Sequence, residues 1–362
     1  MRSLKTSLLW SAVILLVITA SANADRQLID LGLGLAHSIN NNGQIIGSTK
    51  MDGTGYPILF DPTGGKANIN ISPIISGTRQ TGVAYSINNN GQIVGYISTS
   101  VTSTSAYLFD STGSGGGTNL GDGSSAAAIN DNGWIVGYGS HALRFRPLPA
   151  VDLGTLGGYG SSAYAVNDNG RIVGWAYNKS QIYQACLFDS IAGGVNKNLG
   201  TISGFSESMA ESINNLNQIV GCAFNISPNP SNIMSAVLFN SASGGANINL
   251  GALDDYYNHS IARSINDNGQ IVGDAFYGPD MVNFPCRAVL FDPTGQGNNT
   301  DLNTLIDSSW TLRHAYGINN NGWIVGEMTN GSDTHAFLLT PEPASVLLFA
   351  FGGVTILRKR RM

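Results

Sequence analysis

The sequence is poor in charge. Its 18 Lys and Arg and 23 Asp and Glu residues make up 11% of 362 residues, whereas soluble domains average roughly 25%. This scarcity excludes a disordered charged tail and a long coiled coil, since both need many charged residues. Glycine is abundant, with 46 residues. A glycine-rich, charge-poor chain of this length favours one large all-β domain over two domains.

Cysteine and histidine are scarce as well, with three and five residues. Cys186, Cys222 and Cys286 form no Cys-x-x-Cys pair, which excludes the usual zinc and redox motifs. One disulfide is compatible with an exported protein, but we expect small buried side chains instead. The chain also lacks His-Glu-x-x-His, Gly-x-Ser-x-Gly and phosphate-loop motifs. We therefore expect no catalytic residues, no cofactor and no enzymatic activity.

Long apolar runs occur only at the two ends. At the N-terminus, Arg2 and Lys5 precede an apolar run over residues 8–18 and small residues at Ala22 and Ala24. This three-part pattern is typical of a secretory signal peptide, and it predicts cleavage after Ala24. Residues 1–24 are thus predicted to direct export, and a buried core helix is the alternative.

The C-terminus has three parts in a fixed order. An apolar stretch over residues 344–357 would rise about 21 Å as a helix, short of the roughly 30 Å hydrocarbon core. Its basic end is predicted to stay cytoplasmic. The remaining parts are Pro341, Glu342 and Pro343 before the stretch, and Arg358, Lys359, Arg360 and Arg361 after it.

This C-terminal segment, residues 341–362, resembles the PEP-CTERM sorting signal of bacterial exported proteins. The resemblance implies an exosortase-type protease as partner, which cleaves near the Pro-Glu-Pro sequence and releases or re-anchors the body at the membrane. An ordinary tail anchor is the alternative. Without both ends, the chain keeps 12 basic and 22 acidic residues, so its net charge is near −10. A nucleic-acid partner, which needs a basic surface, is not expected.

Between the ends, one unit recurs seven times. The unit reads Ile-Asn-x-Asn-Gly-Gln-Ile-Val-Gly with variations, and its copies lie about 46 residues apart, a period typical of propeller repeats. The copies begin at Ile39, Ile87, Ile129, Val166, Ile213, Ile265 and Ile318.

Each repeat contains the pattern of four short strands, as a propeller blade does. Asn-Gly is a strong hairpin signal because glycine adopts positive φ freely, and Asn217 replaces this glycine in the fifth copy. A fourth-strand segment, Ile29 to Gly32, precedes the first copy and is missing after the seventh. Residues 25–340 are therefore predicted to form a seven-bladed β-propeller whose ring is closed by the N-terminal strand.

The repeats resemble those of extracellular HAF-repeat proteins, named after a His-Ala-Phe motif. The motif stands here as His335, Ala336 and Phe337, with a variant at His141 to Leu143, and the other five copies depart from it. The resemblance implies a secreted bacterial surface protein and supplies no catalytic residues.

Three patterns are candidates for functional sites. Asn-Asp-Asn-Gly in three copies is similar to a calcium loop, but three other copies have no carboxylate there and Leu216 occupies a ligand position, which favours turns over metal sites. Asp61, Asp110, Asp189 and Asp292 recur at strand ends, where aspartate typically forms turns.

The third candidate is the variable position x in the Ala-x-small-Ile segment that opens each repeat. If these strands surround one mouth of the channel, the x side chains form an aromatic and charged binding platform. Packing between blades is the favoured alternative, because each x shares a strand face with the buried Ile two residues later. The platform candidates are His37, Tyr85, Tyr164, Arg263 and Tyr316, with Ala127 and Glu211 at the same position.

Together, these features predict a non-enzymatic, exported protein of the bacterial cell surface or extracellular matrix. Its expected partners are envelope polysaccharide or other surface proteins. The alternative is a glycan-active hydrolase or lyase, or a lectin, with its site at the propeller mouth, because residues scattered over several blades leave no spacing signature.

Overall fold

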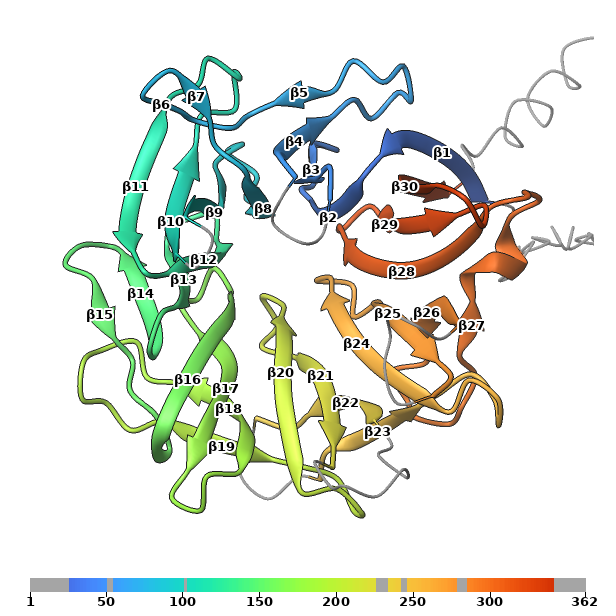
Figure 1. Ribbon diagram of the computed structural model, residues 1–362. Coiled ribbons are helices and arrows are strands. Elements are labelled where there is room, and N and C mark those ends of the chain that lie inside the picture. The colour runs from blue at the N-terminus through green and yellow to red at the C-terminus, as the bar shows by residue number, and fades with distance from the viewer. Residues whose placement is uncertain are drawn as a thin grey trace, which may run out of the picture.

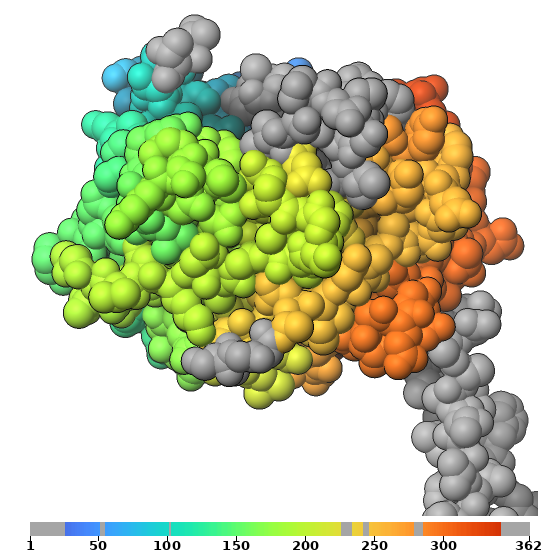
Figure 2. Space-filling view, turned by 90° about the horizontal axis from the view of Figure 1, so that it is seen from below, coloured from blue at the N-terminus to red at the C-terminus, as the bar shows by residue number. Residues whose placement is uncertain are grey.

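The computed structural model describes residues 26–50, 55–100, 103–225, 234–241, 246–278 and 285–341. Seven four-stranded antiparallel sheets stand around a central axis (Figure 1). The protein is therefore a seven-bladed β-propeller, as the repeats predicted. Seen from the rim, the blades follow one another in chain order (Figure 2).

The blades are numbered by the chain order of their innermost strands. Blades 1 to 3 consist of β2 (Leu35–Ile39), β3 (Ile45–Ser48), β4 (Pro57–Phe60) and β5 (Ile69–Asn70); β8 (Gly82–Ile87), β9 (Ile93–Ser100), β10 (Ser103–Phe109) and β11 (Gly117–Asp122); and β12 (Ser125–Ile129), β13 (Ile135–Tyr138), β14 (Ala142–Arg146) and β15 (Val151–Asp152). Blades 4 and 5 consist of β16 (Gly157–Val166), β17 (Ile172–Asn178), β18 (Tyr183–Phe188) and β19 (Lys197–Gly200); and β20 (Glu207–Ile213), β21 (Ile219–Phe224), β22 (Met234–Phe239) and β23 (Ile248–Gly251).

Blades 6 and 7 complete the ring. They consist of β24 (His259–Ile265), β25 (Ile271–Phe276), β26 (Cys286–Phe291) and β27 (Thr300–Asp301); and β28 (Thr311–Ile318), β29 (Ile324–Thr329), β30 (Thr334–Pro341) and β1 (Arg26–Leu33). A hairpin of β6 (Ile74–Ile75) and β7 (Thr78–Arg79) lies between blades 1 and 2, and the short helix η1 (Leu302–Leu305) follows β27.

The N-terminal strand closes the ring. β1 pairs with β30 in antiparallel register, from Arg26 opposite Pro341 to Leu33 opposite His335. This confirms the prediction that the fourth-strand segment before the first repeat completes the last blade.

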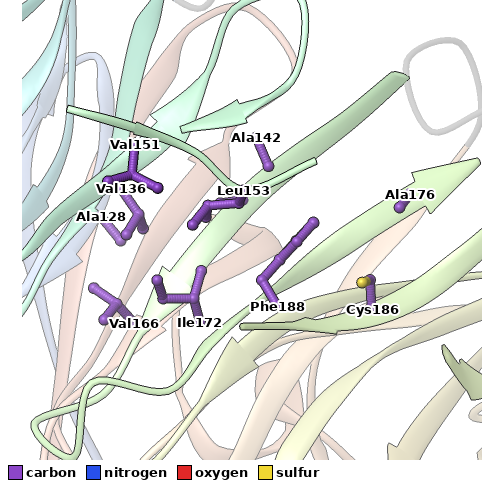
Figure 3. Packing of buried hydrophobic residues seen from close by; sticks show 11 residues of the cluster. Ala128, Val136, Ala142, Val151, Leu153, Val166, Ile172, Ala176, Cys186 and Phe188 are labelled. Atoms are coloured by element: carbon purple, nitrogen blue, oxygen red, sulfur yellow. The ribbon is translucent and has the colours of Figure 1, made fainter. Parts of the chain in front are cut away.

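The core lies between neighbouring blades rather than within one sheet. In blade 4, Ile172 packs toward blade 3 in the cluster shown in Figure 3, whereas its neighbour Val173 packs toward blade 5. Both side chains are fully buried. Apolar residues on both faces of a short strand are what the Ile-Val pairs predicted.

The hairpin between the first two strands of each blade needs a left-handed residue. Gly91 has a φ of 74° in blade 2, and Asn217 has a φ of 64° at the same position in blade 5. Asparagine tolerates this conformation better than other residues with a side chain. The substitution in the fifth repeat thus preserves the turn, as predicted.

The first asparagine of each turn links its blade to the next. Its Nδ2 donates a hydrogen bond of 2.7–3.0 Å to the backbone carbonyl oxygen of the equivalent asparagine one blade further on. The last of these bonds returns to the first blade, so the chain of bonds is closed. We call this set the asparagine belt: Asn40, Asn88, Asn130, Asn167, Asn214, Asn266 and Asn319.

Two further circles of hydrogen bonds run beside the belt. The backbone N–H after each belt asparagine donates to the side chain at the same position in the next blade, at 2.8–2.9 Å. The turn residue before the glycine donates its side-chain amide to the next blade in six blades, at 2.8–3.0 Å. Leu216, whose side chain is 64% exposed, occupies the seventh place. The repeat motif therefore joins blades as well as turning strands.

The predicted signal peptide and most of the C-terminal segment lie outside the described residues, as do Glu342, Pro343, Arg358, Lys359, Arg360 and Arg361. Pro341, the first residue of the predicted sorting signal, ends β30. Within the described residues, no helix has the length and apolar character needed to cross a membrane.

Candidate functional site

The side chains at position x of the seven innermost strands meet in the central channel. They line one cavity of about 340 Å³, together with Tyr138. The structure thus brings together the five predicted platform residues and the x residues of the other two blades. The five are His37, Tyr85, Tyr164, Arg263 and Tyr316, and the other two are Ala127 and Glu211.

A β-bulge at x aims these side chains into the channel. In blade 2, Ala84 pairs with Gly95 and Ser86 pairs with Val94, which leaves Tyr85 as an extra residue between them. The same irregularity occurs at x in every blade. Because a bulge breaks the strict alternation of faces, the expectation that x packs between blades was wrong.

The glycine after the Ile-Val pair makes room for this bulge. A Cβ atom on Gly95 would overlap the carbonyl oxygen of Val83, and the equivalent glycine of each other blade would overlap its own partner in the same way. A glycine inside a strand pattern is a known sign of a bulge or of close backbone approach. This was the signal in the sequence that could have placed x in the channel.

A second layer of side chains lies next to the x residues, and one of them, Tyr138, reaches the cavity itself. No pattern in the sequence indicated this layer. Each belongs to the residue directly after that glycine, eleven positions beyond x. In blade 1, His37 Nε2 lies 3.2 Å from Ser48 Oγ. In blade 4, Trp175 Nε1 donates to the Tyr164 hydroxyl at 2.9 Å. The full layer is Ser48, Tyr96, Tyr138, Trp175, Cys222, Asp274 and Glu327.

One side of the cavity is charged. Arg263 forms a buried ion pair with Asp274, which also accepts a hydrogen bond from the Ala315 backbone N–H at 3.2 Å. Burial alone would raise the pKa of Asp274, but the charges of Arg263 and His314 hold it below its usual value. Burial raises the pKa of the Glu211 carboxyl, and Arg263 offsets only part of this effect. The fixed charge of Arg263 is thus balanced by Asp274.

The other side is aromatic. The Tyr85 ring lies 5.9 Å from the ring of His37 and 5.6 Å from that of Tyr96, and the rings of Tyr138 and Tyr164 are 6.1 Å apart. Burial, together with the positive charge of Arg263, lowers the pKa of His37 to about 4. His37 is therefore neutral at physiological pH, and this wall offers ring faces and hydroxyl groups without net charge.

A second hollow of about 180 Å³, smaller and more polar, is lined by the turns that follow the seven innermost strands. Its acidic side chains already accept hydrogen bonds from neighbouring blades. Asp131, for example, accepts from the backbone N–H of Asn89 at 2.8 Å and from its side-chain amide at 2.7 Å. Among the described residues, no three His, Cys, Asp or Glu side chains gather as metal ligands would.

The remaining candidates have structural roles. In the His-Ala-Phe motif, His335 Nδ1 lies 2.8 Å from Asp30 Oδ1 of the closing strand, whereas Ala336 and Phe337 are fully buried. The three cysteines are buried, and none of them forms a disulfide in the described part of the chain. The repeated aspartates cap turns, each accepting a hydrogen bond from the backbone N–H two residues on: Asp61, Asp110, Asp189 and Asp292.

Comparison with known proteins gives similarity without an assigned activity. The model of a family described as "Protein of unknown function (DUF3466)" matches residues 11–120, less than half of the chain. A crystal structure of a protein of unknown function from Dyadobacter fermentans DSM 18053 is 13% identical, with a TM-score of 0.38, over 88% of this chain and 97% of that chain. A comparison with curated proteins finds no match.

Proposed function

We propose that the protein is an exported, non-enzymatic protein of the cell surface or extracellular matrix that binds a sugar unit of envelope polysaccharide in the channel cavity. The observation that carries this proposal is the convergence of seven equivalent side chains on one cavity with an aromatic wall, a guanidinium group and a carboxyl group. Aromatic faces pack against the C–H groups of a sugar ring, while polar groups bind its hydroxyls.

The charge balance of the cavity supports a neutral, hydroxyl-rich ligand. Arg263 is already paired with Asp274, and the carboxyl group of Glu211 lines the same cavity with its pKa raised by burial. A carboxyl group at this place can form hydrogen bonds with sugar hydroxyls. The volume of about 340 Å³ lies at the small end of the range for ligand pockets, roughly 300–1,000 Å³. One or two sugar units suit such a space better than a folded protein segment.

The test is a glycan array of bacterial envelope polysaccharide fragments, followed by calorimetry with residues 25–340. The informative variant is Ala127→Tyr, because three other blades carry tyrosine at this position and the fold accepts it there. The added ring fills the cavity and should abolish binding, whereas Ala192→Tyr on the exposed surface should leave it intact. Wild-type protein that binds no fragment would contradict the proposal.

One observation favours glycan-active catalysis as the second candidate. A carboxyl with a raised pKa in a cavity is suited to general acid catalysis, and Glu211 has this property. A reducing-end assay on the bound fragments separates the two functions. If the wild-type protein cleaves the fragments and Glu211→Gln does not, the function is that of a glycan hydrolase or lyase.

The proposal of export rests on the two terminal sequence patterns, and the proposed sorting partner is a membrane-bound exosortase. Mass spectrometry of the mature protein is the direct measurement. We expect an N-terminus at Asp25 and a C-terminus near Pro341 to Pro343. An intact chain in the cytoplasmic fraction would contradict both assignments.

A further inference from the structure

Blade 4 carries a continuous row of aromatic rings that begins beside the cavity. We call Tyr159, Trp175, Tyr177 and Tyr183 the aromatic strip. Trp175 contacts the cavity wall through its hydrogen bond to Tyr164. From Trp175 the ring centroids follow at 4.7 Å to Tyr183, 4.4 Å from Tyr183 to Tyr177 and 4.2 Å from Tyr177 to Tyr159.

The strand register explains why these rings gather on one side of the blade. Trp175 and Tyr177 alternate along β17 on the same side as Val173, which packs toward blade 5. Tyr183 lies directly opposite Tyr177 on β18. Exposure increases along the strip, since Val173 is fully buried, Trp175 and Tyr177 are half-buried and Tyr159 is 66% exposed. The strip therefore leads from the channel toward solvent.

The spacing of the rings restricts what the strip can bind. Neighbouring centroids lie only 4.2–5.4 Å apart, so the rings pack on one another and leave no space for a cation between them. An aromatic cage for a quaternary ammonium group needs such a space. A nucleic acid would also stack on aromatic rings, but it needs a basic groove, and the body of this chain is acidic. A chain of neutral sugar rings satisfies both restrictions.

We propose that the aromatic strip is a second sugar-binding subsite, continuous with the channel cavity, and that the protein therefore recognises an oligosaccharide rather than a single sugar. This inference rests on the proposed function. The cavity holds one end of the glycan, and the following units lie along the strip with Tyr159 as the outermost contact. The backbone N–H of Tyr159 donates to Gln181 Oε1 at 3.2 Å, which ties the outer end of the aromatic strip to the β17–β18 turn.

Blade 6 offers a matched control. Tyr256 and Tyr277 stack with their ring centroids 4.6 Å apart, and they are 51% and 43% exposed. Neither ring is among the described side chains that line the channel cavity. Removing these two rings takes away a similar exposed aromatic area without touching the proposed path.

The experiment measures affinity against chain length, using fragments of one to six units from the same envelope polysaccharide panel. For wild-type protein, binding should tighten about tenfold from one to three units, equivalent to 1.4 kcal/mol. The double variant Tyr159→Ala, Tyr177→Ala should bind all lengths like a single unit, whereas Tyr256→Ala, Tyr277→Ala should keep the increase. Tyr159→Ala alone, a change at an exposed position, should lose part of the increase and guards against misfolding of the double variant.

The possible outcomes separate the two proposals. Binding of single sugars with no dependence on length would overturn the strip while leaving the cavity proposal in place. An equal loss in the strip and control variants would also overturn it. Wild-type protein that binds no fragment of any length contradicts the proposed function itself.

Discussion

The asparagine belt makes a strong prediction at Asn88, whose side chain is only 3% exposed. Its Nδ2 donates to the Asn130 carbonyl at 2.9 Å and to Gln92 Oε1 at 2.8 Å. Its Oδ1 accepts from the backbone N–H groups of Asn90 at 3.1 Å and Gln92 at 2.9 Å. Asn88→Ala removes all four bonds, two of which the Asn88 side chain accepts from the turn backbone and one of which joins the next blade.

The expected loss follows from this count. At about 1 kcal/mol for each bond, Asn88→Ala should lower the free energy of unfolding by about 4 kcal/mol. This is a large part of the roughly 5–15 kcal/mol that stabilises a typical domain. Asn90→Ala is the matched control, because its exposed side chain makes one bond to the next blade, at 2.8 Å, and should cost about 1 kcal/mol or less.

Urea unfolding of residues 25–340, followed by circular dichroism, measures both changes through the midpoint. A third variant, Asn88→Asp, keeps the acceptor oxygen and loses the donor. Its carboxylate would face two oxygen acceptors, so the folded-state pKa should rise above the unfolded value of about 3.9. Its stability should then be highest at low pH and fall as pH rises through the folded pKa. Equal losses in Asn88→Ala and Asn90→Ala would refute the role of the belt.

Three further predictions use the same unfolding assay. Leu216→Asn should raise stability by about 1 kcal/mol, because it supplies the bond that the other six blades make, and no gain would argue against it. Gly95→Ala should lower the free energy of unfolding by at least about 3 kcal/mol, because the added Cβ overlaps the Val83 carbonyl oxygen. The control is Gly123→Ala, which has open space around it and a φ of 68° and should cost about 1 kcal/mol. Similar losses in both variants would contradict the bulge argument. The pKa of His37 is about 4 in the folded protein and 6.5 as a free group. The neutral ring therefore contributes about 3 kcal/mol to the free energy of unfolding above pH 6.5, and this contribution is lost as the pH falls through 4. His37→Gln should remove this pH dependence.

The sequence predicted the ring because each repeat carries its own local signals. Asn90-Gly91 sets a hairpin without help from distant residues, and the Ile-Val pairs need apolar neighbours on both faces. The Ile29 to Gly32 segment, displaced to the front of the chain, indicated how the ring closes. These signals depend on backbone conformation and burial, which a single repeat already specifies.

The site was harder to predict because it depends on contacts between distant residues. Tyr85 was a candidate for the channel, but strict alternation placed it on the same face as Ile87, and only the bulge removes that objection. Asn88 was predicted only as a turn residue, since its partner Asn130 lies 42 positions away in the next repeat. Trp175 and Asp274 had no motif at all, and they matter because β-sheet pairing places them next to the x residues.

The way the ring closes determines how the protein would carry a mechanical load. β30, which leads to the C-terminus, is not an edge strand, because β1 pairs along one side of it and β29 along the other. A tether attached beyond Pro341 would therefore pull on a strand held by two ladders of hydrogen bonds. Pulling out an edge strand breaks the hydrogen bonds of a single ladder. Extracting β30 requires the hydrogen bonds of two ladders to break together. By pairing with β30, the N-terminal strand β1 thus strengthens the attachment of the strand on which a C-terminal tether would pull.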